Sequence, residues 1–153
     1  MPSRPKEHIR MPATPVFNAT PVRIWATVDA LVTGPLLIPA SALWLVDTLY
    51  QLNQLLDDQI PMPEFNGLQL FFVCLAGALG ALWAMVRLLW PQPQLSLADS
   101  LGRLWVAGLI SLFVIGHGLP DILWVFVLTE LSGALHQGWN LLRHDSEQRR
   151  ASV

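Results

Sequence analysis

Charged side chains are scarce in this sequence. They make up 13% of its 153 residues, whereas hydrophobic residues make up 53% and the mean hydropathy is +0.45. A soluble domain carries about 25% charged residues, so roughly half of the usual solubilising charge is missing. The net charge of -2 argues against a nucleic-acid-binding protein that depends on bulk basicity. The composition therefore predicts an integral membrane protein whose main partner is the lipid bilayer.

Cysteine is almost absent as well. Cys74 is the single cysteine, so the chain can form no intrachain disulfide. It lies in an apolar stretch, which predicts a packing role rather than a reactive thiol. The sequence also lacks a glycine-rich phosphate loop, a zinc-ligand spacing and a nucleophile elbow. We therefore predict no metal and no cofactor, and a non-enzymatic protein is favoured over an enzyme.

Four apolar segments predict four membrane-spanning helices. They cover residues 22–50, 68–90, 104–115 and 122–141. A helix needs about 20 residues to cross the hydrocarbon core. The first segment contains Gly34, Pro35 and Pro39, and it can still cross as a kinked helix because neighbouring helices satisfy the freed backbone groups. With short connections, the pattern predicts an all-α fold, a membrane-spanning four-helix bundle arranged up-down-up-down.

The polar ends of the chain complete the predicted domain organisation. Residues 1–21 carry five prolines and three basic residues, which predicts a disordered basic N-terminal arm. Residues 22–141 form the predicted four-helix transmembrane domain, and residues 142–153 a flexible cytoplasmic tail. All nine lysines and arginines fall in the two tails, in the middle loop or beside them, and none falls in the other two loops. Positive charge marks the cytoplasmic side, so both termini are predicted to be cytoplasmic.

Glu130 is the most informative polar residue, because it lies near the centre of the fourth segment. An acidic group at the bilayer centre costs about 2.5–3.5 kcal/mol on insertion scales. Such groups usually face the bundle interior or a water-filled cavity. Gly133 and Gln137 lie within about 60° of it on the same helix, which predicts one polar, closely packed face. Two roles stay open for Glu130: a hydrogen-bonded lock between helices, or a proton-carrying or ligand-binding group.

The first segment carries two further carboxylates, Asp29 and Asp47. They are 18 residues apart, about five helical turns, so both face one side unless the prolines between them rotate the helix. A polar stripe that faces Glu130 is one possibility. An ion pair near the inner surface is favoured for Asp29, with three candidate arginines: Arg23, Arg87 and Arg103.

Two local patterns predict how the other helices pack and begin. Small residues repeat at four-residue spacing in the second segment, as Ala76, Gly80 and Ala84, and as Gly77 and Ala81. This spacing allows close backbone approach, either to a helix of the same chain or to a second copy. Residues 96–99 predict a capping box before the third helix, and Asp99 with Arg103 then forms a weak surface pair.

The overall layout resembles that of small bacterial four-helix membrane proteins, including the DoxX-like group. The resemblance covers about residues 22–141 and rests on the number and length of the spans, the inside tails and Gly34 in the first helix. It implies a location in the bacterial cytoplasmic (inner) membrane. The sterol-isomerase-like four-helix proteins share this topology.

Two functions are consistent with these patterns. The first is an accessory or assembly component that contacts itself or another membrane protein, because small-residue stripes are present and catalytic motifs are not. The alternative is a small-molecule or proton-coupled binding or transport protein that uses the intramembrane carboxylate of Glu130. In that case Asp29, Asp47 and Gln137 are the candidates for lining the same path.

Overall fold

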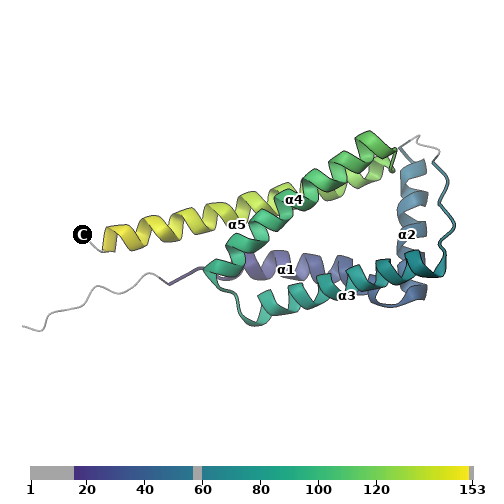
Figure 1. The fold of residues 1–153 in the computed structure, drawn as a ribbon. Helices are drawn as coiled ribbons and strands as arrows, with labels where there is room; N and C mark the ends of the chain where they lie inside the picture. Colours follow the sequence, from purple (N-terminus) through teal and green to yellow (C-terminus); the bar gives the residue numbers. More distant parts are fainter. Residues whose placement is uncertain (1–15, 57–59, 152–153) are drawn as a thin grey trace, which may run out of the picture.

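The computed structural model describes residues 16–56 and 60–151, and all regular structure in these ranges is helical. The prediction of an all-α fold is confirmed. In chain order (Figure 1), the elements are α1 (Thr20–Thr33), the 3-10 helix η1 (Gly34–Leu37), α2 (Pro39–Gln54), α3 (Gly67–Leu89), α4 (Pro93–His117), the 3-10 helix η2 (Asp121–Leu123) and α5 (Trp124–Ala151).

The long helices form two pairs. Helix α1 packs against α3, and α4 packs against α5, while α1 also touches α5 (Figure 1). Helix α2 lies across one end of these helices, where the Oδ1 atom of Asn53 accepts a hydrogen bond of 2.9 Å from the backbone N–H of Ile122. At the opposite end, the Nδ2 atom of Asn140 donates to the carbonyl oxygen of Asn18 at 2.9 Å. The residues just before α1 and the last part of α5 therefore lie at the same end of the molecule.

The first apolar segment is broken into two helices. The axis turns by 115° between Thr20–Leu37 and Pro39–Gln54, so residues 22–50 form two differently directed helices instead of one kinked span. Pro39 disfavours helical dihedral angles at the residue before it, and Ile38 is extended, with φ -118 and ψ 131. The Ser41 hydroxyl donates to the carbonyl oxygen of Pro35 at 2.6 Å, which satisfies an acceptor that the break exposes.

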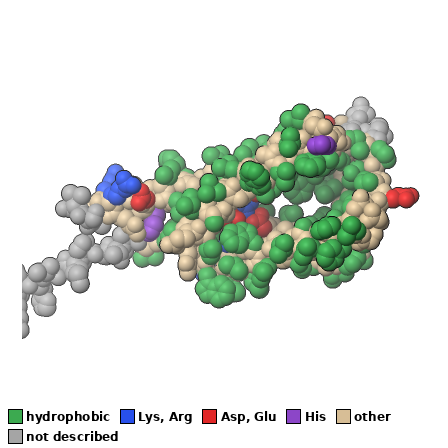
Figure 2. Space-filling view, in the orientation of Figure 1, with side chains coloured by type: hydrophobic (Ala, Val, Ile, Leu, Met, Phe, Trp, Pro, Cys, Tyr) green, Lys and Arg blue, Asp and Glu red, His purple; other side chains and the backbone are tan. Residues whose placement is uncertain are grey.

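Helices α3 and α4, with 23 and 25 residues, are long and apolar enough to cross a membrane. The distribution of side chains around them is the reverse of that in a soluble protein. Large apolar side chains cover the surface (Figure 2), and the largest fully buried side chains include Arg87, Gln137 and Asn53. A surface of this kind is unfavourable in water and is compatible with an integral membrane protein.

The helix ends differ from the predicted ones at two places. Residues 142–151, predicted as a flexible tail, continue helix α5, and the predicted N-terminal arm falls largely on residues 1–15, outside the described residues. The capping box predicted at residues 96–99 is wrong, because α4 begins at Pro93, whose fixed φ suits the first helical position. A capping box instead begins α3, where the Asn66 side chain accepts from the Gln69 N–H at 2.9 Å and the Gln69 side chain accepts in return at 3.0 Å.

The small residues of α3 pack against the same chain. A Cβ atom at Gly77 would lie 2.5 Å from Cβ of Leu36, and one at Gly80 would lie 2.6 Å from Cγ2 of Thr33. Ala84 is fully buried and Ala81 is half-buried, whereas Ala76 is exposed. The face that contacts α1 and η1 therefore contains Gly77, Gly80 and Ala84, and Ala76 lies outside it.

Candidate functional site

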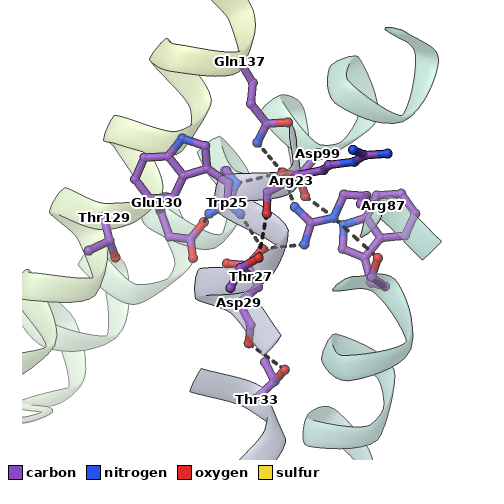
Figure 3. Close-up of polar contacts among 12 residues, drawn as sticks. Arg23, Trp25, Thr27, Asp29, Thr33, Arg87, Asp99, Thr129, Glu130 and Gln137 are labelled. Atoms are coloured by element: carbon purple, nitrogen blue, oxygen red, sulfur yellow. Dashed lines mark hydrogen bonds and ion pairs between the residues drawn. The ribbon is translucent and has the colours of Figure 1, made fainter. Parts of the chain in front are cut away.

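Five charged side chains meet where the two helix pairs come together. Asp29 comes from α1, Arg87 from α3, Asp99 and Arg103 from α4, and Glu130 from α5 (Figure 3). Arg87 is fully buried, and the side chains of Asp99 and Arg103 are 5% and 4% exposed. Asp29 and Glu130 are more open, at 20% and 19%. Three carboxylates face two guanidiniums, so the cluster has one more negative than positive charge when all five groups are ionised.

Both arginines bridge the carboxylates of Asp29 and Asp99. Arg87 donates from Nη1 to Oδ2 of Asp99 at 2.6 Å and from Nη2 to Oδ2 of Asp29 at 2.5 Å. Arg103 donates from Nε to Oδ2 of Asp99 at 2.8 Å and from Nη2 to Oδ2 of Asp29. The remaining nitrogen of Arg103, Nη1, donates to Oε2 of Glu130 at 3.0 Å. One network of charge-assisted hydrogen bonds thus connects α1, α3, α4 and α5.

A second layer of polar groups orients Asp99. The indole Nε1 of Trp83 donates to its Oδ1 atom at 2.8 Å, and the Gln137 amide donates to its Oδ2 atom at 2.6 Å. The Ser96 hydroxyl in turn donates to the amide oxygen of Gln137 at 3.3 Å. Asp99 therefore accepts hydrogen bonds from α3, α4 and α5, which makes it the most strongly bound carboxylate of the cluster.

Gly133 gives Arg103 room to cross from α4 to α5. A Cβ atom at Gly133 would lie 2.9 Å from Cδ of Arg103 and 3.0 Å from its Nε and Nη1 atoms. On its other side, the guanidinium lies over the ring of Trp25, 5.2 Å from the ring centroid, in a cation–π contact. The predicted packing residue Gly133 therefore serves the passage of a charged side chain.

A cavity of about 490 Å³ borders the cluster. Its walls come from α1, α3, α4 and α5, and they are mainly apolar, including Val28, Val32, Val106 and Phe126. The charged residues form its polar end, and Figure 2 shows the hollow between the helix pairs with acidic and basic side chains beside it.

At the polar end of the cavity, the arginine nitrogens all have hydrogen-bond partners, whereas two carboxylate oxygens have none among the described residues. All three side-chain nitrogens of Arg103 already donate to carboxylates, and those of Arg87 donate to two carboxylates and to the carbonyl oxygen of Trp83. By contrast, Oδ1 of Asp29 and Oε1 of Glu130 accept no hydrogen bond from the part of the chain that the structure describes. Each guanidinium thus binds through all three of its nitrogens, whereas one oxygen of Asp29 and one of Glu130 accept no hydrogen bond from these residues.

The structure brings together three of the four predicted polar site residues. Asp29, Glu130 and Gln137 all belong to the cluster, whereas Asp47 is separated from them by the 115° break and accepts from the Gln51 amide at 2.7 Å in α2. The favoured pairing of Asp29 with arginine is confirmed for two of the three candidates, Arg87 and Arg103.

The central position of Asp99 was not predicted. Asp99 and Arg103 do form the expected i,i+4 pair, but the prediction of a surface pair is wrong because both are buried. One sequence signal pointed to this interior. Ser96, Asp99, Ser100 and Arg103 share one face of α4, and all are buried. A polar face on an otherwise apolar helix indicates that this face contacts other polar groups inside the protein.

Comparison with known proteins identifies no relative. No family model matches the chain, and neither a curated protein nor a solved structure matches it. Among residues 16–56 and 60–151, no group of three or more histidine, cysteine, aspartate or glutamate side chains could hold a metal ion. The proposed function therefore rests on the chemistry of the cavity and of the charged cluster beside it.

Proposed function

We propose that this protein is a multi-pass integral membrane protein of the bacterial cytoplasmic membrane, with α1, α3, α4 and α5 as an up-down-up-down bundle. The apolar surface and the lengths of α3 and α4 support embedding in a bilayer. The segment Thr20–Leu37 is about 27 Å long at 1.5 Å per residue, which is close to the hydrocarbon thickness. Helix α2 then lies across the outer end of the bundle.

The distribution of basic residues supports cytoplasmic termini. The two ends of the described chain lie together, because the ring of Phe17 contacts that of His144 at 5.5 Å between centroids. Arg143, Arg149 and Arg150 lie in the same part of α5, on the side that the positive-inside rule assigns to the cytoplasm.

Labelling of single cysteines tests this topology in a Cys74→Ser background. A membrane-impermeant thiol reagent added outside intact cells is expected to label Ile60→Cys and to spare Gln148→Cys. After the cells are opened, both positions are expected to react. Labelling of Gln148→Cys in intact cells would contradict the orientation, as would protection of Ile60→Cys until the cells are opened.

Within this bundle, the cavity is proposed to bind a small, largely apolar molecule with a hydrogen-bond-donating head group. Its volume of about 490 Å³ is within the usual range of small-molecule sites, about 300–1,000 Å³. Apolar walls with polar groups at one end suit an amphipathic ligand. The observation that carries the proposal is a pair of acceptor oxygens, Oδ1 of Asp29 and Oε1 of Glu130, on two residues that line the cavity and bind the arginines through their other oxygen.

Filling the cavity tests the binding role. A Cβ atom at Gly102, which lines the cavity, would meet nothing within 4 Å, so Gly102→Phe places a ring in the open space without a backbone clash. Gly108, on the same helix, is equally unobstructed and does not line this cavity, so Gly108→Phe is the matched control.

Small molecules extracted from wild type and both variants, purified in lipid nanodiscs, would be compared by mass spectrometry. At least one compound is expected to be retained by wild type and Gly108→Phe and depleted about tenfold in Gly102→Phe, a loss of about 1.4 kcal/mol in affinity. Identical extracts from all three proteins would refute the binding role.

An accessory or assembly role is the second candidate, and one observation favours it. An apolar groove of about 710 Å³ runs between α4 and α5 near the chain ends, lined by Leu97, Ala134, Leu135 and Leu142 among others. The small residues of α3 offer less support, because Gly77 and Gly80 already contact η1 and α1. Purification in mild detergent would test this role, and a chain that runs alone as a monomer would contradict it.

A further inference from the structure

The charge balance of the cluster is incomplete without another positive charge. Asp29, Asp99 and Glu130 face Arg87 and Arg103 in the interior between the helices. A net charge in such an environment is unfavourable unless a counter-charge or a proton neutralises it. Neutrality therefore requires either one proton on a carboxylate or one bound monocation.

Glu130 accepts fewer hydrogen bonds than the other two carboxylates of the cluster. Asp99 accepts from four different side chains, namely Trp83, Arg87, Arg103 and Gln137. Asp29 accepts from both guanidiniums. Glu130 accepts a single hydrogen bond, from Arg103, and it lines the cavity. The proton or cation that balances the cluster is therefore expected at Glu130.

The charges around Glu130 favour a bound cation over a bound anion. The charged residues that face it are Asp29 from α1, Arg87 from α3, and Asp99 and Arg103 from α4. On α5 itself, His136 accepts a hydrogen bond of 3.2 Å from the indole Nε1 of Trp25, whose ring also contacts the Arg103 guanidinium. An anionic head group would add a second negative charge to a cluster that already has one in excess, whereas an ammonium balances that charge and can donate to Oδ1 of Asp29 and Oε1 of Glu130.

We propose that the cavity binds an amphiphilic monocation with an N–H-bearing ammonium head, and that its binding displaces a proton from Glu130. This inference rests on the proposed binding function. In the exchange, the Glu130 O–H bond breaks, the proton passes to the solvent, and the carboxylate accepts a hydrogen bond from the ammonium group. The charge of the cluster with its occupant is neutral before and after, so proton and ligand compete for one site.

A fluorescent primary alkylamine, dansylcadaverine, can serve as the probe for the full chain in nanodiscs, and its neutral N-acetyl derivative as the matched comparison. The amine is expected to bind wild type at least about tenfold more tightly than the acetylated form, a difference of about 1.4 kcal/mol. Its affinity is expected to fall as the pH is lowered from about 8 to about 6, because protons compete for Glu130. Calorimetry in two buffers of different ionisation enthalpy is expected to show one proton released per amine bound.

The variant Glu130→Gln keeps the shape of the side chain and removes its ionisable proton. We expect it to bind both probes equally, with no proton release and no pH dependence, whereas Glu147→Gln, the same change at an exposed position of α5, should behave as wild type. Far-ultraviolet circular dichroism and gel filtration check that each variant is folded.

The outcomes separate this inference from the proposed function. Equal binding of both probes by wild type, with loss of both in Gly102→Phe, would leave the binding role intact and overturn the monocation. Tight amine binding that Glu130→Gln does not weaken, or that releases no proton, would overturn the exchange at Glu130. Failure of wild type to bind either probe saturably would count against the cavity as a binding site altogether.

Discussion

Helix α3 meets α1 and η1 at glycines, whereas α4 and α5 meet through large charged and polar side chains. In the first pair, where η1 continues α1, Gly77 lets the backbone of Leu36 in η1 approach so closely that its carbonyl carbon would lie 2.7 Å from an added Cβ. In the second pair, Arg103 reaches over Gly133 to Glu130 on the neighbouring helix. Glycine thus serves two different purposes in one molecule, close backbone contact in one pair and passage of a guanidinium in the other.

For a protein embedded in a bilayer, as proposed above, this difference matters because lipid offers little hydrophobic driving force for helix association. Backbone approach stabilises a pair through van der Waals contact, and it tolerates almost no change of shape. A charged network tolerates some movement of its long side chains, but it fails when one charge is removed. The two pairs should therefore respond differently to substitutions, and the following predictions run from the largest expected effect to the smallest.

Removal of the Arg103 guanidinium is expected to be the most damaging change. Arg103→Met leaves three carboxylates with Arg87 as their one guanidinium partner, and we expect a loss of about 3–5 kcal/mol in the free energy of unfolding. Unfolding in mixed micelles with a denaturing detergent measures this free energy. Arg149→Met removes an arginine whose side chain is 81% exposed and is expected to change stability little, so equal losses in the two variants would contradict the central role of Arg103.

A methyl group at Gly77 tests the close-packed pair. Gly77→Ala places a Cβ atom 2.5 Å from that of Leu36 and against its backbone, which cannot rotate away, so we expect a loss of about 1–3 kcal/mol. The same unfolding assay applies. Gly108→Ala, where the added carbon meets nothing within 4 Å, is the control. If Gly77→Ala is as stable as its control, α3 and η1 do not rely on backbone contact.

The same change at Gly133 is expected to cost less, about 1 kcal/mol, because the atoms it meets belong to a flexible side chain that can shift. A double-mutant cycle sharpens the comparison. If Gly133 serves Arg103, then Gly133→Ala should have almost no further effect in an Arg103→Met background. Additive losses in the double variant would show that Gly133 packs against the α4 backbone instead.

Neutralisation of Asp47 is expected to have the smallest effect. Asp47→Asn alters an exposed residue on α2, outside the cluster, and should change stability by less than about 0.5 kcal/mol and leave amine binding unchanged. Asp29→Asn removes a negative charge that both arginines contact and should weaken both properties. Similar behaviour of the two variants in unfolding and probe-binding assays would mean that the break at Ile38 does not separate their functions.

The sequence by itself determined the all-helical fold, and it selected Asp29, Glu130 and Gln137 among the polar residues that meet between the helices. Hydropathy over about 20 residues is a local property, and a charge inside such a stretch must find a partner, so Glu130 and Asp29 could be selected without a structure. The same reasoning gave Arg23, Arg87 and Arg103 as candidate partners of Asp29, and the structure pairs it with the last two.

The tertiary structure decided how these residues combine. Whether Pro35 and Pro39 kink a helix or end it depends on what accepts the freed hydrogen bonds, and here a break of 115° removes Asp47 from the site. The burial of Asp99 and the unused oxygen of Glu130 depend on how four helices, distant in sequence, rotate and approach one another. Helical periodicity fixes which residues share a face, but the contacts between faces are made by the assembled bundle.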